Sequence, residues 1–197
     1  MILEQTLTRL RELRLTGMAD ALEEQRGIPD VQGLTFEDRL ALLVEREATM
    51  REDRRLTRLL RQARLRLPAS VEGLDFRSPR ELDRSVVLRL AACDWIRSHQ
   101  VVLITGATGT GKTYLACALG QAACGRGHST RYYRLSRLLG ELALARADGS
   151  YPRILDRLQK TELLVLDDYG LNSLTDPERR DLLEVLEDRH GRQATLV

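Results

Sequence analysis

Residues 101–113, VVLITGATGTGKT, decide the fold of this chain. The run VVLIT at 101–105 is typical of a short strand that is buried on both faces in a parallel sheet. The segment GATGTGKT at 106–113 follows at once and fits the pattern G-x-x-x-x-G-K-S/T, and a helix is expected over 112–125. Strand, glycine loop and helix in this order predict a phosphate-binding loop. A glycine-rich turn that binds nothing is the alternative, and the flanking strand and helix disfavour it.

Each part of this loop has an expected role. The three glycines let the backbone turn so that its amides point at phosphate oxygens, and the following helix adds its positive end. The Lys112 ammonium is the expected catalytic contact to the β and γ phosphates, and the Thr113 hydroxyl is expected to bind Mg²⁺. The candidate nucleotide-binding residues are Gly106, Ala107, Thr108, Gly109, Thr110, Gly111, Lys112, Thr113 and Tyr114.

A second apolar run, LLVLD at 163–167, predicts another buried strand, and it ends in two carboxylates. A magnesium-dependent nucleotide site needs a carboxylate at the end of a neighbouring strand. We expect Asp167 to hold Mg²⁺, through water, and Asp168 to orient or deprotonate the attacking water as a catalytic residue. The alternative is that Asp168 only starts or caps the following loop. The two motifs together predict ATP and Mg²⁺ as cofactors.

The remaining elements of residues 81–197 alternate between strands and helices. This order predicts an α/β fold, with a parallel sheet and flanking helices. Asp176-Pro177 and His190-Gly191 place proline at the start and glycine at the end of one helix. The other expected elements are helices over 81–98, 136–146 and 153–159, strands over 130–133 and from 194, and a turn over 148–152.

Residues 1–67 are expected to form a small, all-helical N-terminal domain, joined by a linker at 68–80 to the domain at 81–197. Leucines recur at helical spacing near the N-terminus. Thr35 and Asp38 resemble a capping box that opens a second long helix, expected to run to about Leu67. The breaks expected between the helices are at Gly17, Gly27 and Pro29.

Composition excludes several classes of protein. The 197 residues are 43% hydrophobic and 30% charged, which is a globular profile, and no apolar run is long enough for a membrane helix. Three cysteines without C-x-x-C spacing indicate core residues, not a disulfide framework or a zinc site. We therefore expect a soluble, cytoplasmic protein with no membrane partner. The formal net charge of +2 does not by itself demand a nucleic acid.

Arginines dominate the basic residues, and two groups of them are candidate DNA contacts. In the segment REDRRLTRLLRQARLRL at 51–67, helical spacing places arginines on one face and leucines on the other. Such a helix presents guanidinium groups to phosphates. The alternative is a helix face that only contacts solvent. The candidates on this face are Arg51, Arg54, Arg58 and Arg61, with Arg55 beside them.

A second group of basic residues surrounds the segment between the strands at 130–133 and 163–167. No aromatic stacking surface accompanies either group, so contacts to the DNA backbone with weak sequence preference are expected. The candidate contacts in this group are Arg137, Arg153 and Arg157.

Three quoted stretches carry a resemblance to a known family: GATGTGKTYLA, LLVLDDYG and DLLEVLEDRHGR. Together they resemble the IstB-like ATP-binding proteins of insertion sequences, which are relatives of the DnaC helicase loaders. The resemblance covers essentially the whole chain. It implies an AAA+ P-loop ATPase that forms an ATP-dependent homo-oligomer on double-stranded DNA and assists the transposase of the same element. The family's nucleotide residues map onto the glycines of the loop, Lys112, Thr113, Asp167 and Asp168.

The resemblance also implies parts beyond Val197. Family members continue to a sensor residue, an arginine finger and a helical lid, so we expect the domain at 81–197 to be incomplete and to hydrolyse ATP at close to the background rate. In the implied strand order 5-1-4-3-2, the strand from Ala194 lies between the strands at 101–105 and 163–167. The fifth strand would be absent, which is expected to leave one side of the strand at 101–105 unpaired and its apolar faces partly uncovered. If the chain does turn over, Arg180 or Arg189 is the candidate to complete a neighbour's site.

Three other functions fit the sequence less well. Replicative helicase loading, as in the DnaC proteins, uses the same fold with another partner. A nucleotide-binding remnant without turnover is the second. A small-molecule kinase is the third, and it is disfavoured because no acceptor-binding motif is visible and the adjacent carboxylates suit water activation.

Overall fold

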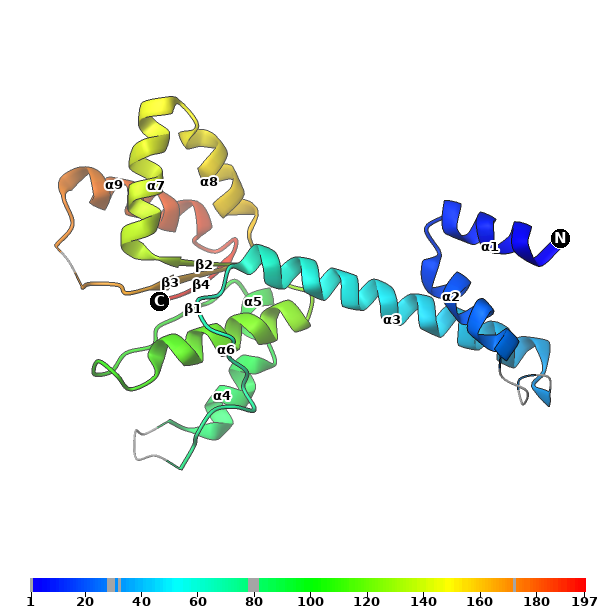
Figure 1. The fold of residues 1–197 in the computed structure, drawn as a ribbon. Helices are drawn as coiled ribbons and strands as arrows, with labels where there is room; N and C mark the ends of the chain where they lie inside the picture. Colours follow the sequence, from blue (N-terminus) through cyan, green and yellow to red (C-terminus); the bar gives the residue numbers. More distant parts are fainter. Residues whose placement is uncertain (1, 28–30, 32, 78–81, 172) are drawn as a thin grey trace. The chain divides into compact units, whose positions relative to one another are not determined.

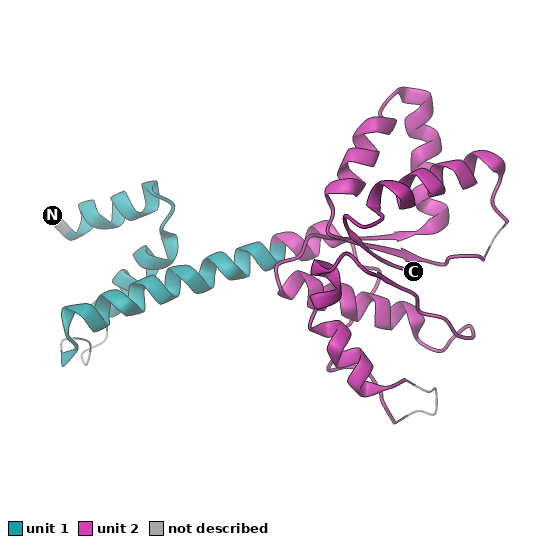
Figure 2. Cartoon of the chain, turned by 180° about the vertical axis from the view of Figure 1, so that it is seen from behind, with its two compact units in different colours: residues 1–57 teal, residues 58–197 magenta. Residues whose placement is uncertain are grey.

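A computed structural model describes residues 2–27, 31, 33–77, 82–171 and 173–197. The chain divides into two compact units, residues 1–57 and 58–197, coloured separately in Figure 2. The division falls inside helix α3 (Phe36–Ala63), whereas the sequence places the domain boundary after residue 67. Pro29 and Glu81, expected at a break and at a helix start, lie outside the described residues. In the part that is described, no helix has the length and apolarity to cross a membrane.

The first unit consists of α1 (Ile2–Glu12), α2 (Thr16–Glu24), the 3₁₀ turn η1 (Gln25–Gly27) and the first part of α3. The chain turns between α1 and α2 at Arg14, whose φ is 61°. The break expected at Gly17 is wrong, because Gly17 lies inside α2. A Cβ there would be 2.8 Å from the Glu47 Cα, so the position requires glycine for close packing, not for a turn.

Helix α3 begins and ends at residues whose local chemistry explains its limits. The Asp38 amide donates to the Thr35 hydroxyl at 3.2 Å, and that hydroxyl donates to the Asp38 carboxylate at 2.8 Å. The capping interaction expected at this end is therefore confirmed. The other end comes earlier than the expected Leu67, because Arg64 adopts a φ of 51° and leaves the helical conformation directly after Ala63.

The second unit contains a parallel four-stranded sheet in the order β1-β4-β3-β2. Its strands are β1 (Val101–Val102), β2 (Thr130–Arg134), β3 (Leu163–Asp167) and β4 (Ala194–Leu196). The strand from Ala194 thus lies between the P-loop strand and the strand that ends in Asp167, as expected. The register pairs Leu163 with Ala194 and Arg134 with Asp167.

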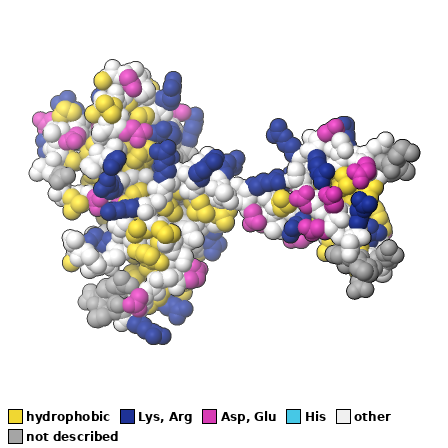
Figure 3. Space-filling view, in the orientation of Figure 1, with side chains coloured by type: hydrophobic (Ala, Val, Ile, Leu, Met, Phe, Trp, Pro, Cys, Tyr) yellow, Lys and Arg dark blue, Asp and Glu magenta, His cyan; other side chains and the backbone are white. Residues whose placement is uncertain are grey.

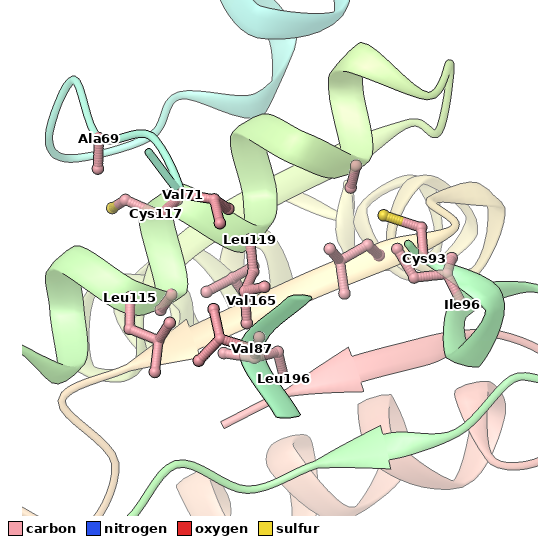
Figure 4. Packing of buried hydrophobic residues seen from close by; sticks show 14 of the residues in the cluster. Ala69, Val71, Val87, Cys93, Ile96, Leu115, Cys117, Leu119, Val165 and Leu196 are labelled. Carbon is pink, nitrogen blue, oxygen red and sulfur yellow. The ribbon is translucent and has the colours of Figure 1, made fainter. Parts of the chain in front are cut away.

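Helices cover both faces of this sheet (Figure 1). On one face lie α4 (Arg84–Ala91), α5 (Asp94–Arg97) and α6 (Lys112–Gly125), and on the other lie α7 (Leu135–Asp148), α8 (Tyr151–Lys160) and α9 (Asp176–Arg189). Alternate residues of the central strands enter two separate apolar clusters, one on each face. In the first cluster, Leu119, Val87 and Val165 pack together with Cys93 and Cys117 (Figure 4). The third cysteine, Cys124, is buried as well.

The two apolar runs differ in burial. In β3, Leu163 to Leu166 are at most 1% exposed, which confirms burial on both faces. In the run at 101–105, Val101 is 54% and Leu103 is 68% exposed, so the expected burial on both faces is wrong there, and the expected partial exposure of its apolar faces is confirmed. This run lies at the edge of the described sheet, where Val102 and Ile104 pack against the cluster around α6 and the opposite face is uncovered. Figure 3 shows a group of hydrophobic side chains on the surface of the second unit.

Two helix boundaries also differ from the expected ones. The helix expected over 81–98 is interrupted at Cys93, which has a φ of 66° and separates α4 from α5. The helix expected from Arg153 begins earlier, at Tyr151, with Pro152 in its first turn. Proline fits that position because the first turn of a helix needs no amide donor there.

Candidate nucleotide site

The P-loop, residues 106–113, has the backbone conformation that its glycines predict. Gly106, Gly109 and Gly111 have φ values of 153°, 83° and 91°. Residues with a Cβ rarely adopt such angles, so these positions favour glycine. Gly111 is also the N-cap residue of α6, which begins at Lys112, and the positive end of this helix therefore faces the loop.

The Lys112 ammonium lies over the P-loop. Its Nζ donates to the carbonyl oxygens of Gly106 and Ala107, both at 2.8 Å. The side chain of Thr110 donates to the same Ala107 oxygen at 2.8 Å and tightens the loop. Lys112, one of the two lysines in the chain, is thus placed where a phosphate would need a positive charge.

Thr113 and Asp167 come together although they lie in α6 and β3. The Thr113 hydroxyl donates to Asp167 Oδ2 at 2.8 Å. The geometry joins the two residues that the sequence assigns to Mg²⁺. Hydroxyl and carboxylate oxygens are the ligands that Mg²⁺ prefers, so the donor set fits this ion.

Tyr132 is a further member of this site that the sequence analysis did not identify. Its hydroxyl, on β2, donates to Asp167 Oδ2 at 2.6 Å, and the Asp168 amide donates to Oδ1 at 2.9 Å. Burial acts to raise the pKa of Asp167, but the hydrogen bonds from Tyr132 and Thr113 outweigh it and hold the pKa below its usual range. Asp167 is therefore ionised at neutral pH.

Arg66 was also missed, and it contacts both carboxylates of the acidic pair, Asp167 and Asp168. Its Nη1 lies 3.8 Å from Asp167 Oδ2 and 3.7 Å from Asp168 Oδ2.

Tyr132 and Arg66 differ in how far the sequence could have indicated them. A hydroxyl on a strand beside β3 could have indicated Tyr132 as a candidate. Arg66 had no comparable signal, because it is one arginine of many in its segment.

Asp168 differs from its neighbour in conformation and exposure. Its φ of 59° is in the left-handed region, which aspartate tolerates better than most residues. Its side chain is 29% exposed, compared with 12% for Asp167. The more accessible carboxylate is thus available to solvent water, while the buried one is held by hydrogen bonds.

A cleft of about 940 Å³ runs past the P-loop and the acidic pair. Its polar end includes Lys112 and Thr113, and its apolar lining includes Leu103 and Leu171. Tyr114, the last residue of the candidate nucleotide set, also lines this cleft, and its hydroxyl lies so close to Gly73 that a Cβ on Gly73 would clash with it. The dimensions suit a ligand of nucleotide size.

The arginines of the first candidate group have different environments within their own units. In the first unit, Arg51 donates to the buried Glu47 at 2.7 Å, and Arg54 donates to the Thr16 hydroxyl. In the second unit, Arg58 and Arg61 are exposed on the last turns of α3, where Leu59 is buried. The expected separation of arginines from leucines on this helix is therefore present.

The arginines of the second candidate group also differ in how available they are for a DNA contact. Arg137 and Arg153 are exposed. Arg157 instead pairs with Glu141 at 2.6 Å and donates to the Tyr133 hydroxyl at 3.1 Å, so it ties α8 to α7 and β2.

Arg189 cannot reach a neighbouring molecule. It is 1% exposed and donates to the backbone oxygens of Leu158, Thr161 and Ala194, and burial lowers its pKa to about 10. The expectation that it could complete a neighbour's site is wrong, because its guanidinium is used inside the fold. Arg180 is exposed.

Comparisons with known proteins agree with this geometry. Residues 8–197 match the family model described as "IstB-like ATP binding protein". The insertion sequence IS1162 ATP-binding protein of Pseudomonas fluorescens is 48% identical over 198 residues, which cover 100% of this chain and 86% of that protein.

Two solved structures share the fold at low sequence identity. The replication initiator DnaA, bound to AMPPCP and single-stranded DNA, has a TM-score of 0.59 at 21% identity. That match covers 67% of this chain and 42% of DnaA. The DnaC helicase loader has a TM-score of 0.54 at 19% identity, over 65% of this chain and 75% of the loader. These two matches show an AAA+ P-loop fold.

Proposed function

The chain belongs to the family of IstB-like ATP-binding proteins, and from that premise we propose that it binds and hydrolyses ATP with Mg²⁺ and assists a transposase on DNA. The observation that carries the nucleotide part is the 2.8 Å contact between Thr113 and Asp167 at the edge of the P-loop. It joins a phosphate-binding loop to an ionised carboxylate. The insertion-sequence relatives support the transposition part.

In this proposal the P-loop amides and Lys112 bind the triphosphate, and Thr113 and Asp167 hold Mg²⁺. The ion neutralises charge on the phosphates and supplies no covalent chemistry of its own. Asp167 Oδ2 already accepts two hydrogen bonds in the protein, which favours contact with the ion through water. Asp168 is then the carboxylate that orients the attacking water.

Equilibrium titration with a fluorescent ATP analogue tests the nucleotide site. Lys112→Ala removes a charge-assisted hydrogen bond worth roughly 1.5 to 3 kcal/mol, so affinity is expected to fall about 10- to 100-fold. Lys160→Ala is the matched control, because Lys160 pairs with Asp156 in α8, outside the cleft. Equal affinities of the parent chain and Lys112→Ala would refute the site.

DNA is the proposed partner because the candidate surfaces present exposed arginines, which can bind backbone phosphates. Aromatic side chains, which would stack on bases, are fewer there than arginines. Arg58, Arg61, Arg137 and Arg153 are exposed candidates of the second unit, and Arg157 is exposed as well but pairs with Glu141. Guanidinium groups bind backbone phosphates without reading bases, so the proposed binding is to double-stranded DNA with weak sequence preference. Assembly of several copies on DNA in the presence of ATP completes the proposal.

Salt dependence tests the DNA contacts. Each phosphate contact contributes about 0.9 to the slope of log affinity against log salt, so changing Arg58 and Arg61 to Gln together is expected to lower that slope by about 1.8. Changing Arg97 and Arg179, which pair with the exposed Asp94 and Asp176, to Gln together controls for the loss of two positive charges elsewhere in the second unit. An unchanged slope would show that this part of α3 contacts only solvent.

A further inference from the structure

Arg66 reaches the acidic pair from a segment that no sequence motif includes. It follows the end of α3 and precedes Pro68. Besides its contacts of 3.8 Å and 3.7 Å to Asp167 and Asp168, its guanidinium interacts electrostatically with the Tyr132 hydroxyl. Tyr132 in turn donates to Asp167. Arg66 therefore contacts one carboxylate directly and the other both directly and through a hydroxyl.

Packing on both sides of Arg66 fixes its backbone. Leu65 packs so closely on α6 that a Cβ on Gly120 would lie 2.9 Å from its Cδ2. Ala69, after Pro68, is 4% exposed and belongs to the same apolar cluster. The guanidinium thus lies at the acidic pair because of the fold of residues 65–69, and not only because of charge attraction.

The position of Arg66 has two opposite consequences for a metal-dependent site. A positive charge beside Asp167 competes with Mg²⁺ for the same carboxylate. The contact to Asp168 Oδ2, in contrast, restrains a side chain that is otherwise partly exposed and would sample several rotamers. Removing Arg66 should therefore help metal binding and harm the orientation of Asp168.

We propose that Arg66 is a positioning residue for ATP hydrolysis, which holds the carboxylate of Asp168 in place and weakens Mg²⁺ binding at Asp167. The proposal rests on the proposed function of this site. It also gives the segment after α3 a direct contact to the nucleotide site, within the second unit. Both contacts come from Nη1, and lysine at this position would keep the positive charge but lose the planar guanidinium.

The test measures Mg²⁺-dependent binding of a fluorescent ATP analogue and steady-state hydrolysis for the parent chain, Arg66→Ala and Arg66→Lys. Arg66→Ala is expected to lower the Mg²⁺ concentration for half-maximal binding about threefold, because the contact is partly exposed. Its kcat is expected to fall about tenfold with a nearly unchanged KM for ATP, since only orientation is lost. Arg66→Lys should retain the parent's Mg²⁺ requirement and recover part of the kcat.

The matched control is Arg64→Asn, which removes one charge from the same segment, and asparagine tolerates the φ of 51° at that position. Arg66→Gln replaces Arg66→Ala if the alanine variant does not fold. Equal Mg²⁺ requirements of Arg66→Ala and Arg64→Asn would overturn the role of Arg66 alone. A parent chain without any Mg²⁺-dependent nucleotide binding would overturn the proposed function and this inference together.

Discussion

The P-loop and the acidic pair form the two sides of the candidate site, and they are built differently. The P-loop is made of consecutive residues, and its geometry depends on three glycines with positive φ and on contacts within the loop. The acidic pair depends on side chains from other segments, namely Thr113 in α6, Tyr132 in β2 and Arg66 after α3. One side is therefore local, and the other exists only when the fold is complete.

This difference implies that substitutions on the two sides have different consequences. A change in the P-loop should alter nucleotide affinity directly through the backbone or Lys112. A change around the acidic pair should alter metal dependence, turnover or stability, because Asp167 joins several elements of the sheet and its helices. The following predictions test that separation.

The largest expected effect is on turnover and belongs to the acidic side. Asp168→Asn keeps the shape of the side chain but removes the carboxylate proposed to orient water, so any hydrolysis above the uncatalysed rate is expected to be lost while ATP-analogue affinity stays within twofold. Steady-state phosphate release and equilibrium titration measure the two quantities. A parallel loss of affinity would contradict the separation of the two sides.

A smaller effect is expected for Tyr132→Phe. It removes a hydrogen bond from a hydroxyl to an ionised carboxylate, and we expect the free energy of unfolding to fall by about 1.5 kcal/mol. Urea denaturation provides the measurement. Tyr133→Phe, on the opposite face of β2, is the control with a smaller loss, because Arg157 retains its pairing with Glu141. Equal losses in both variants would argue against a special role for the Tyr132 hydroxyl.

The smallest expected effect tests the backbone of the P-loop. At Gly109 a Cβ would meet no atom within 4 Å, so Gly109→Ala isolates the conformational cost of a φ of 83°. That cost is about 1 kcal/mol, which corresponds to about a fivefold loss of ATP-analogue affinity. Gly125→Ala is the control, because Gly125 also has open space around it but lies in α6. If Gly109→Ala bound as tightly as the parent, the loop conformation would not be needed for binding.

The same contrast explains which features the sequence could predict. GATGTGKT encodes its own turn through glycine, so the loop, the start of α6 at Lys112 and the position of Thr113 follow from consecutive residues. LLVLD also predicts its strand and burial. Arg66 and Tyr132 reach Asp167 through tertiary packing, which no short motif describes.

Strand burial shows a related limit. VVLIT and LLVLD have similar apolar composition, but β3 lies between two strands, whereas β1 lies at the edge of the described sheet with Leu103 exposed. Apolar composition predicts a strand, and the topology decides how much of that strand is covered.

The central claim is that the P-loop and the acidic pair share one Mg²⁺ site through Thr113 and Asp167. A double-mutant cycle with Thr113→Val and Asp167→Asn tests it most directly, with the Mg²⁺ concentration for half-maximal ATP-analogue binding as the readout. The account predicts that each single change raises this concentration about tenfold and that the double change raises it little further. Factors that multiply in the double variant, or binding that needs no Mg²⁺ in the parent chain, would contradict the claim.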